Sequence, residues 1–114
     1  MTQQNTAIRL EKIRTHFLTE LEKQYFEVKV LRGRLDQVVD PSETCQAIGR
    51  ICHKIAGTAA TLGFPVLGYA AAEIDDFVAT SDSKQSGFRS EMRDHADHLL
   101  LLMSLIFDDD AMFA

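Results

Sequence analysis

The stretch from Cys52 to Asp75 reads CHKIAGTAATLGFPVLGYAAAEID, and it decides the fold and the site that we expect. On a helix, with ~100° of rotation per residue, His53 falls on the same side as Gly49, Gly57 and Ala60. The apolar side chains gather on the other side; they are Ile48, Cys52, Ile55, Ala59 and Leu62. A helical glycine costs ~1 kcal/mol relative to alanine. We therefore expect Gly57 to leave room for a large partner beside an outward-pointing His53.

The residues around this stretch predict where its helices begin and end. Asp40-Pro41-Ser42-Glu43 combines an aspartate at the N-cap, a proline at the first helical position and a glutamate that closes a capping box. The second helix is expected to run through Leu62 and to stop at Gly63. Pro65 opens a third helix that ends near Thr80. Its predicted core residues are Val66, Tyr69, Ala70, Ile74, Phe77 and Val78.

The two outer helices are less well bounded by the sequence. Apolar residues recur every three or four positions from Leu10 to Val38, which predicts a long first helix from Thr6. Either its first turns form an extra short helix that folds over the bundle end, or Gly33 loosens its last part. Residues 1–5 are expected to be loose. The fourth helix starts near Ser86, and its expected face holds Phe88, Met92, His95, Leu99, Met103 and Ile106.

The end of the fourth helix is both acidic and rich in leucine. Asp108 to Asp110 are unfavourable at the negative end of a helix dipole, so we expect the helix to end there and residues 108–114 to be loose. Leu100 and Leu101 point away from the predicted face. Either the first helix covers them, or they form an exposed patch through which the chain makes a homodimer.

Together these segments predict one all-α domain over residues 1–114, an up-down-up-down four-helix bundle. A net charge of −5 without a basic cluster argues against a nucleic-acid partner. The apolar runs are too short to span a membrane, and we expect a cytoplasmic protein. Cys45 and Cys52 are two helical turns apart, ~10 Å between Cα atoms, so they are predicted to be free thiols in the core.

The other histidines carry weaker signals than His53. His95 lies in the predicted apolar face and is interpreted as a packing residue, and His16 is expected to face solvent. His95 and His98 lack further donors from another helix, so we expect no metal site. The turns adjacent to His53 hold no Ser, Asp or Glu to orient it as a catalytic base. With no phosphate-binding glycine loop either, the sequence does not predict an enzyme with a small-molecule pocket.

The segment HKIAGTAATLGFPVLGYAAAEI from His53 resembles the signature of histidine-containing phosphotransfer (HPt) domains, and the flanking helices fit that family over nearly the whole chain. The resemblance implies that His53 accepts a phosphoryl group from a receiver-domain aspartate and returns it to another receiver in two-component signalling. The chain would be a carrier without turnover of its own. It would hold no cofactor, since the receiver supplies Mg²⁺, and its partners would be response-regulator receivers or a hybrid histidine kinase.

The implied docking surface surrounds His53 and comprises Gly49, Arg50, Lys54, Ala56, Gly57, Ala60 and Thr61. The sequence departs from the family at Ala56, where many members carry a lysine that neutralises phosphoryl charge. Arg50, one turn before His53, is our candidate to replace that cation. This departure leaves open an alternative function, in which the chain is a bundle that binds and regulates a receiver or kinase without carrying phosphate. A sensor-kinase dimerisation bundle fits less well, because Lys54 occupies the position where an acidic residue usually follows the histidine.

Overall fold

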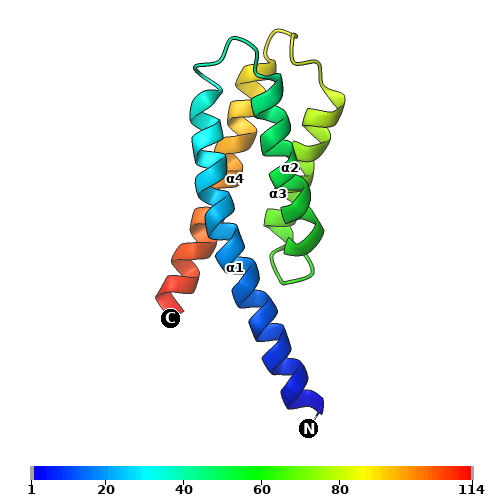
Figure 1. Cartoon of the computed structure of the whole chain (residues 1–114), viewed down its shortest axis with the longest axis vertical. Helices are drawn as coiled ribbons and strands as arrows, with labels where there is room; N and C mark the ends of the chain where they lie inside the picture. The colour runs from blue at the N-terminus through cyan, green and yellow to red at the C-terminus, as the bar shows by residue number, and fades with distance from the viewer. Residues whose placement is uncertain (1, 114) are drawn as a thin grey trace.

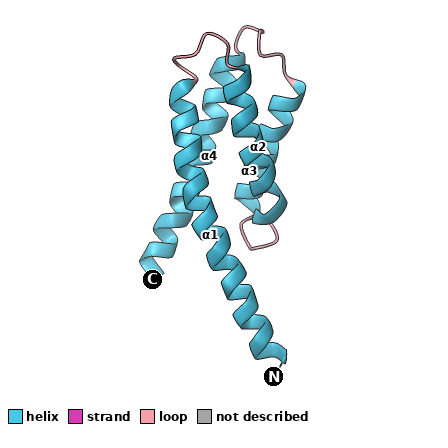
Figure 2. Ribbon diagram, viewed as in Figure 1, coloured by secondary structure: helices cyan, strands magenta, loops and turns pink. Residues whose placement is uncertain are grey.

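The structure is a computed structural model that describes residues 2–113, with the side chains of residues 5–108. All regular elements in these residues are helices, in the order α1 (Thr2–Arg34), α2 (Ser42–Ala59), α3 (Pro65–Thr80) and α4 (Phe88–Phe113). They run up and down in turn, with two connections at one end and one at the other (Figures 1 and 2). The four-helix bundle predicted from the sequence is confirmed.

One core runs through the middle of the bundle, and every helix contributes side chains that are almost fully buried. They include Leu21 and Val28 from α1 and Leu35 just after it, Ile48, Cys52 and Ile55 from α2, Leu67, Ala71 and Ile74 from α3, and Met92, Leu99 and Met103 from α4. Cys45 and Cys52 are free and buried, as predicted. Burial raises the pKa of the Cys45 thiol to about 11 and that of Cys52 to about 12.

Local sequence signals locate most helix ends. Pro65 occupies the first turn of α3, and Gly63, with φ 94°, makes the turn before it. At the start of α2 the N-cap is Pro41 rather than Asp40, and no side chain makes the predicted capping box. Asp40 Oδ1 still accepts a hydrogen bond from the Ser42 backbone N–H at 3.0 Å. α2 ends at Ala59, three residues earlier than predicted, because the backbone N–H of Phe64 reaches back to its carbonyl at 2.8 Å.

The outer helices extend further than the sequence predicts. α1 is one continuous helix over Thr2–Arg34, so no separate short helix is present in these residues; it ends one residue after Gly33, and residues 35–38 of the predicted stripe are not helical. α4 passes through Asp108 without ending and continues to Phe113. Met1 and Ala114 lie outside the described residues. The prediction that the aspartates terminate α4 is therefore wrong.

Two of the predicted core positions on α3 are wrong as well. Val66 and Tyr69 are exposed, Tyr69 to 74% of its surface, whereas Leu67 and Ala71 are buried. Tyr69 lies five residues before Ile74, which places it ~140° around the helix from that core residue. On α4, Leu100 packs against the core while Leu101 is exposed, so the two leucines do not act as one patch.

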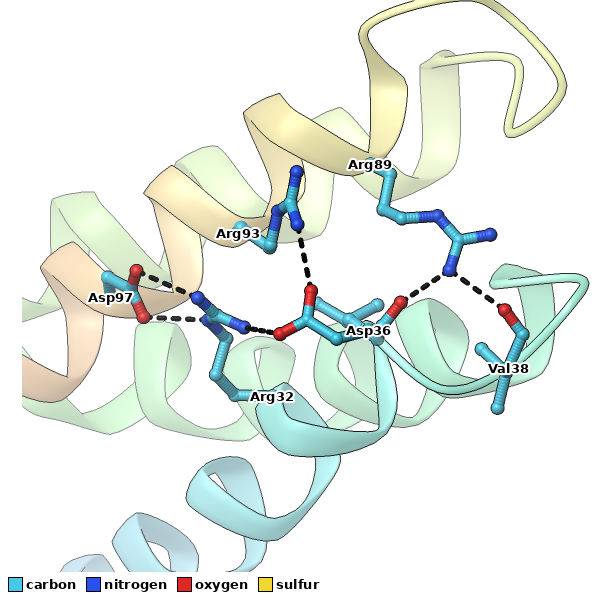
Figure 3. Close-up of polar contacts among 7 residues, drawn as sticks. Arg32, Asp36, Val38, Arg89, Arg93 and Asp97 are labelled. Atoms are coloured by element: carbon cyan, nitrogen blue, oxygen red, sulfur yellow. Dashed lines mark hydrogen bonds and ion pairs between the residues drawn. The ribbon is translucent and has the colours of Figure 1, made fainter.

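A chain of charged contacts joins the top of α1 to the start of α4 (Figure 3). Arg32 Nε donates to Asp97 Oδ1 at 2.7 Å, and Arg93 Nη1 donates to Asp36 Oδ1 at 2.8 Å. The hydrogen bonds from Arg93 and Arg32 hold the pKa of the Asp36 carboxyl below its usual range. These contacts set the register of α1 against α4.

Arg89 has a different role, because its partners are backbone carbonyls. Its guanidinium donates to the carbonyl oxygens of Leu35, Val38 at 2.8 Å and Val39 at 3.0 Å. Carbonyls at a helix C-terminus have no partner within the helix, so Arg89 supplies donors just past the end of α1.

We expect Arg89→Met to lower the free energy of unfolding by ~1–3 kcal/mol, because hydrogen bonds from a charged donor are lost to partly buried carbonyls. Urea unfolding followed by circular dichroism measures this change. Arg93→Met is the matched control. The partner of Arg93 is the exposed side chain of Asp36, so this variant should lose less free energy of unfolding than Arg89→Met. Equal losses in the two variants would show that the backbone contacts of Arg89 add nothing.

Candidate functional site

The sequence-predicted histidine lies in the middle of α2 and is open to solvent. The His53 side chain is 78% exposed, while its neighbours Cys52 and Ile55 are buried in the core. His53 therefore points outward from the core, as predicted. A mid-helix position gives the ring a stiff mount, since the backbone on both sides is held by helical hydrogen bonds.

Asp75 of α3 is a partner of His53 that the sequence analysis missed. Its Oδ2 lies 2.8 Å from His53 Nδ1, across the interface between the two helices. The turns next to His53 on its own helix hold no acid, whereas Asp75 comes 22 residues later in the chain. The antiparallel packing of α2 and α3 brings it back beside the ring.

This hydrogen bond sets the chemistry of the imidazole. A carboxylate only accepts hydrogen bonds, so the ring proton of neutral His53 lies on Nδ1 and points at Asp75. The lone pair then lies on Nε2, the ring nitrogen that is not held by the carboxylate. His53 can thus act as a nucleophile or an acceptor at Nε2 without any further group on this chain.

The surface beside the ring is a shallow depression, not an enclosed pocket. It has a volume of about 410 Å³ and lies between α2 and α3; it is lined by Gln46, Gly49, Arg50, His53, Lys54, Asp75, Val78 and Ala79. A small substrate would remain largely in water there, whereas binding pockets enclose most of their ligand. The shape suits contact with a protein surface.

The small residues of α2 have two different roles. A Cβ added at Gly57 would have no heavy atom within 4 Å, so Gly57 leaves open space next to His53, as predicted. A Cβ added at Gly49 would lie 3.3 Å from Val78 Cγ1, and one added at Gly68 would lie 3.6 Å from the Cβ of Ala60. Gly49 is buried, and together with Gly68 it lets α2 and α3 pack closely.

This close packing corrects part of the predicted docking surface. We expected Gly49 and Ala60 to clear space for a partner, but Gly49 is buried against Val78 of α3; Ala60 is exposed, and its backbone borders Gly68. Ala56 is half-buried and packs against the core, which takes much of its side chain out of the predicted surface. The small residues thereby bring Asp75 within hydrogen-bond distance of His53, which is a positioning role that periodicity alone does not reveal.

Two cationic side chains lie near the ring of His53. Arg50 and Lys54 are both exposed and both line the depression that holds His53. Lys54, one residue after His53, also reaches the depression, because side chains of this length extend around the helix. Thr61 is exposed, but it lies in the turn after α2 and does not line the depression.

The other histidines have the surroundings that the sequence predicts. His95 is half-buried, and its ring centroid lies 5.0 Å from that of Phe77. His16 and His98 are exposed. Within residues 5–108 no three His, Cys, Asp or Glu side chains are grouped so that they could hold a metal ion.

Comparison with known proteins shows that one protein family matches this chain. The model of the Hpt domain matches residues 6–109, which include all of α2 and α3 and most of α1 and α4. No curated protein and no solved structure gave a significant match. Among the helices that the structure describes, none has the length and apolar character needed to cross a membrane.

Proposed function

We propose that this chain, which belongs to the Hpt domain family, carries a phosphoryl group on His53 between the aspartates of receiver domains. Hpt domains act in the phosphorelays of two-component signalling. The observation that carries the proposal for His53 is its geometry: an exposed imidazole on a rigid helix, with Nδ1 held by Asp75 at 2.8 Å and Nε2 free. The open space at Gly57 lets a receiver approach that nitrogen.

The proposed transfer needs little from this chain beyond the nucleophile. The Nε2 lone pair attacks the phosphorus of a receiver aspartyl phosphate in line, an N–P bond forms, the P–O bond breaks, and the aspartate leaves as a carboxylate. The positive charge that develops on the ring lies next to Asp75, which stabilises it. Positioning and charge neutralisation dominate phosphoryl transfer, and the receiver would supply Mg²⁺ and the acidic pocket.

The proposal is tested by mixing the chain with receiver domains that carry labelled aspartyl phosphate. We expect acid-labile, base-stable label on this chain, as for a phosphohistidine, and loss of label from the receiver. A second, unlabelled receiver should then take the label up. If the chain binds receivers and never takes up label, the carrier function is wrong.

The half-buried Ala56, where many members of the family carry a lysine, favours one alternative: a bundle that binds a receiver or a histidine kinase and regulates it without carrying phosphate. The same assay separates the two functions. A regulator changes the rate at which a receiver gains or loses its phosphate, and it remains unlabelled itself.

We expect Asp75→Asn to slow phosphoryl uptake about tenfold to a hundredfold, because a hydrogen bond to a charged group is worth ~1.5–3 kcal/mol and 1.36 kcal/mol is tenfold in rate. Rapid-quench transfer from a labelled receiver measures the rate. Nitrogen NMR of the His53 ring should also show a lower share of the Nδ1–H tautomer. Asp76→Asn is the matched control, since that carboxylate is the exposed neighbour of Asp75. An unchanged rate and tautomer in Asp75→Asn would remove Asp75 from the site.

Arg50 is our candidate for the cation that stabilises the phosphoryl group. We expect Arg50→Ala to slow transfer or shorten the phosphohistidine lifetime by up to about fivefold, since an exposed charge pair is worth ~0–1 kcal/mol. Decay of the labelled chain after removal of the receiver measures the lifetime. Lys54→Ala tests the other lining cation, and Lys84→Ala, in the α3–α4 connection, serves as the control. If only Lys54→Ala has an effect, the assignment to Arg50 is wrong.

A further inference from the structure

The two sides of His53 differ in what a partner would meet there. Gly49 lies ~40° around α2 from His53 and is buried against Val78 of α3, so that side is filled by helix packing. Arg50 and Lys54 lie ~60° and ~100° around α2 in the opposite direction, on the side that faces α1. Both side chains are exposed. A partner that approaches from the α1 side of His53 therefore meets cations.

The open space next to the ring and the charges of α3 favour the same side. Gly57, where an added Cβ would have no heavy atom within 4 Å, lies ~40° from His53 in the direction of the cations. On the other side, α3 carries Glu73, Asp75 and Asp76 but neither lysine nor arginine. A receiver that brings an acidic pocket to His53 is attracted by the cations of α2 and repelled by the acids of α3.

Arg34 continues this row of cations from α2 onto α1. It is the last residue of α1, at the end of the bundle where α2 begins (Figure 1). A hollow of about 400 Å³ between the two helices has Arg34 on its α1 wall and Gln46 and Arg50 on its α2 wall. Gln46 and Arg50 also border the depression that holds His53, so the two hollows adjoin. We call Arg34, Arg50 and Lys54 the basic strip.

The cations of the basic strip are unpaired in the part of the chain whose side chains the structure describes. None of the three forms an ion pair or a side-chain hydrogen bond there, whereas other arginines of α1 and α4 are paired with aspartates. Glu43 borders the same hollow as Arg34 without pairing with it. Glu20 borders the groove beside Lys54, and it pairs with Lys23. In a chain of net charge −5, three neighbouring unpaired cations form a local surface that attracts an acidic partner.

We propose that the basic strip binds the acidic side chains around the phosphorylated aspartate of a receiver, and that Arg34 is the outermost contact. This inference rests on the proposed function, because it names how the receiver lies over His53. The receiver covers α2 and the end of α1, and the acidic outer face of α3 stays outside the contact. Arg34 lies on another helix than His53 and does not line its depression, so it contributes to docking and not to the transfer step.

Titration of receiver domains from the same organism into the full chain, followed by isothermal calorimetry, tests this proposal. We expect Arg34→Glu to weaken receiver binding about tenfold at ~0.1 M salt, and Arg34→Gln to weaken it about threefold. At ~1 M salt, where the screening length falls from ~10 Å to ~3 Å, both variants should bind within about twofold of the wild type. Circular dichroism should show the same helix content in each chain.

Lys12→Glu is the matched control, because it makes the same change of charge on the same helix. Lys12 is exposed and lies ~33 Å before Arg34 along the axis of α1, which is more than three screening lengths at ~0.1 M salt. This variant should bind receivers like the wild type. With the receiver at saturating concentration, Arg34→Glu should take up label from its aspartyl phosphate at the wild-type rate, as expected for a residue that acts in docking alone.

Three results would overturn the proposal. One is equal affinity of Arg34→Glu and Lys12→Glu at ~0.1 M salt, and another is a wild-type chain that binds no receiver. The third is a larger change in affinity from Asp76→Lys than from Arg34→Glu, since the receiver would then lie over α3. Failure of the carrier function has a different signature: the wild type binds receivers through Arg34 and takes up no label, which supports the docking contact and makes the chain a regulator.

Discussion

His53→Gln is expected to abolish phosphoryl uptake from every receiver, which is the largest effect that we predict. Glutamine is of similar size and keeps polar atoms near the Asp75 carboxylate, but its amide has no nucleophilic nitrogen lone pair like that of imidazole. The side chain is 78% exposed, so the free energy of unfolding should change by no more than ~0.5 kcal/mol. Uptake of label from a receiver aspartyl phosphate, measured beside a urea titration, checks both statements.

His98→Gln is the matched control for this experiment. His98 is exposed on α4, far along the chain from the His53–Asp75 pair, and its loss should leave uptake unchanged. Mass spectrometry of the labelled wild-type chain locates the phosphoryl group independently. Label that persists in His53→Gln, or that maps to another histidine, contradicts the assignment of His53 as the acceptor.

Gly57→Leu is expected to weaken receiver binding about tenfold to a hundredfold while leaving the chain folded. The added side chain would stand in the open space beside His53, where a Cβ has no heavy atom within 4 Å, and would keep the receiver surface away from Nε2. Leucine is a better helix former than glycine, so the variant should be up to ~1 kcal/mol more stable. Titration of a receiver by isothermal calorimetry and thermal unfolding measure the two effects.

Gly33→Leu separates the effect on docking from the effect on the helix. Gly33 is also helical with no heavy atom within 4 Å of an added Cβ, but it lies near the end of α1. This control should gain similar stability and bind receivers like the wild type. If Gly57→Leu transfers phosphate at the normal rate, the receiver does not approach over Gly57, and the glycine has another role.

The sequence predicted the helices that carry the site better than it predicted their contacts. Pro65 and Gly63 are local signals that act through backbone geometry, and they placed the start of α3 correctly. The outward direction of His53 also follows from helical periodicity alone. The Asp75 contact depends on how α3 packs on α2, and no spacing within one helix contains that information.

The small residues of α2 show the same limit. Gly49 and Gly57 each lie one turn from His53, about 40° to either side of it in a helical projection, and periodicity does not say which side meets α3. In the structure a Cβ at Gly49 would press on Val78, and one at Gly57 would touch nothing. The end of α4 is a further case, because the charge of Asp108 predicts termination there, yet the helix continues to Phe113.

The pairing of α2 with α3 has a consequence for how the site forms during folding. The two helices are consecutive, joined by the short turn through Gly63, and they pack more extensively on each other than any other pair does within the described residues. Contacts between segments close in sequence have a low loop-closure entropy and form rapidly. The nucleophile and its carboxylate can therefore meet in a helical hairpin before α1 and α4, which are far apart in sequence, find each other.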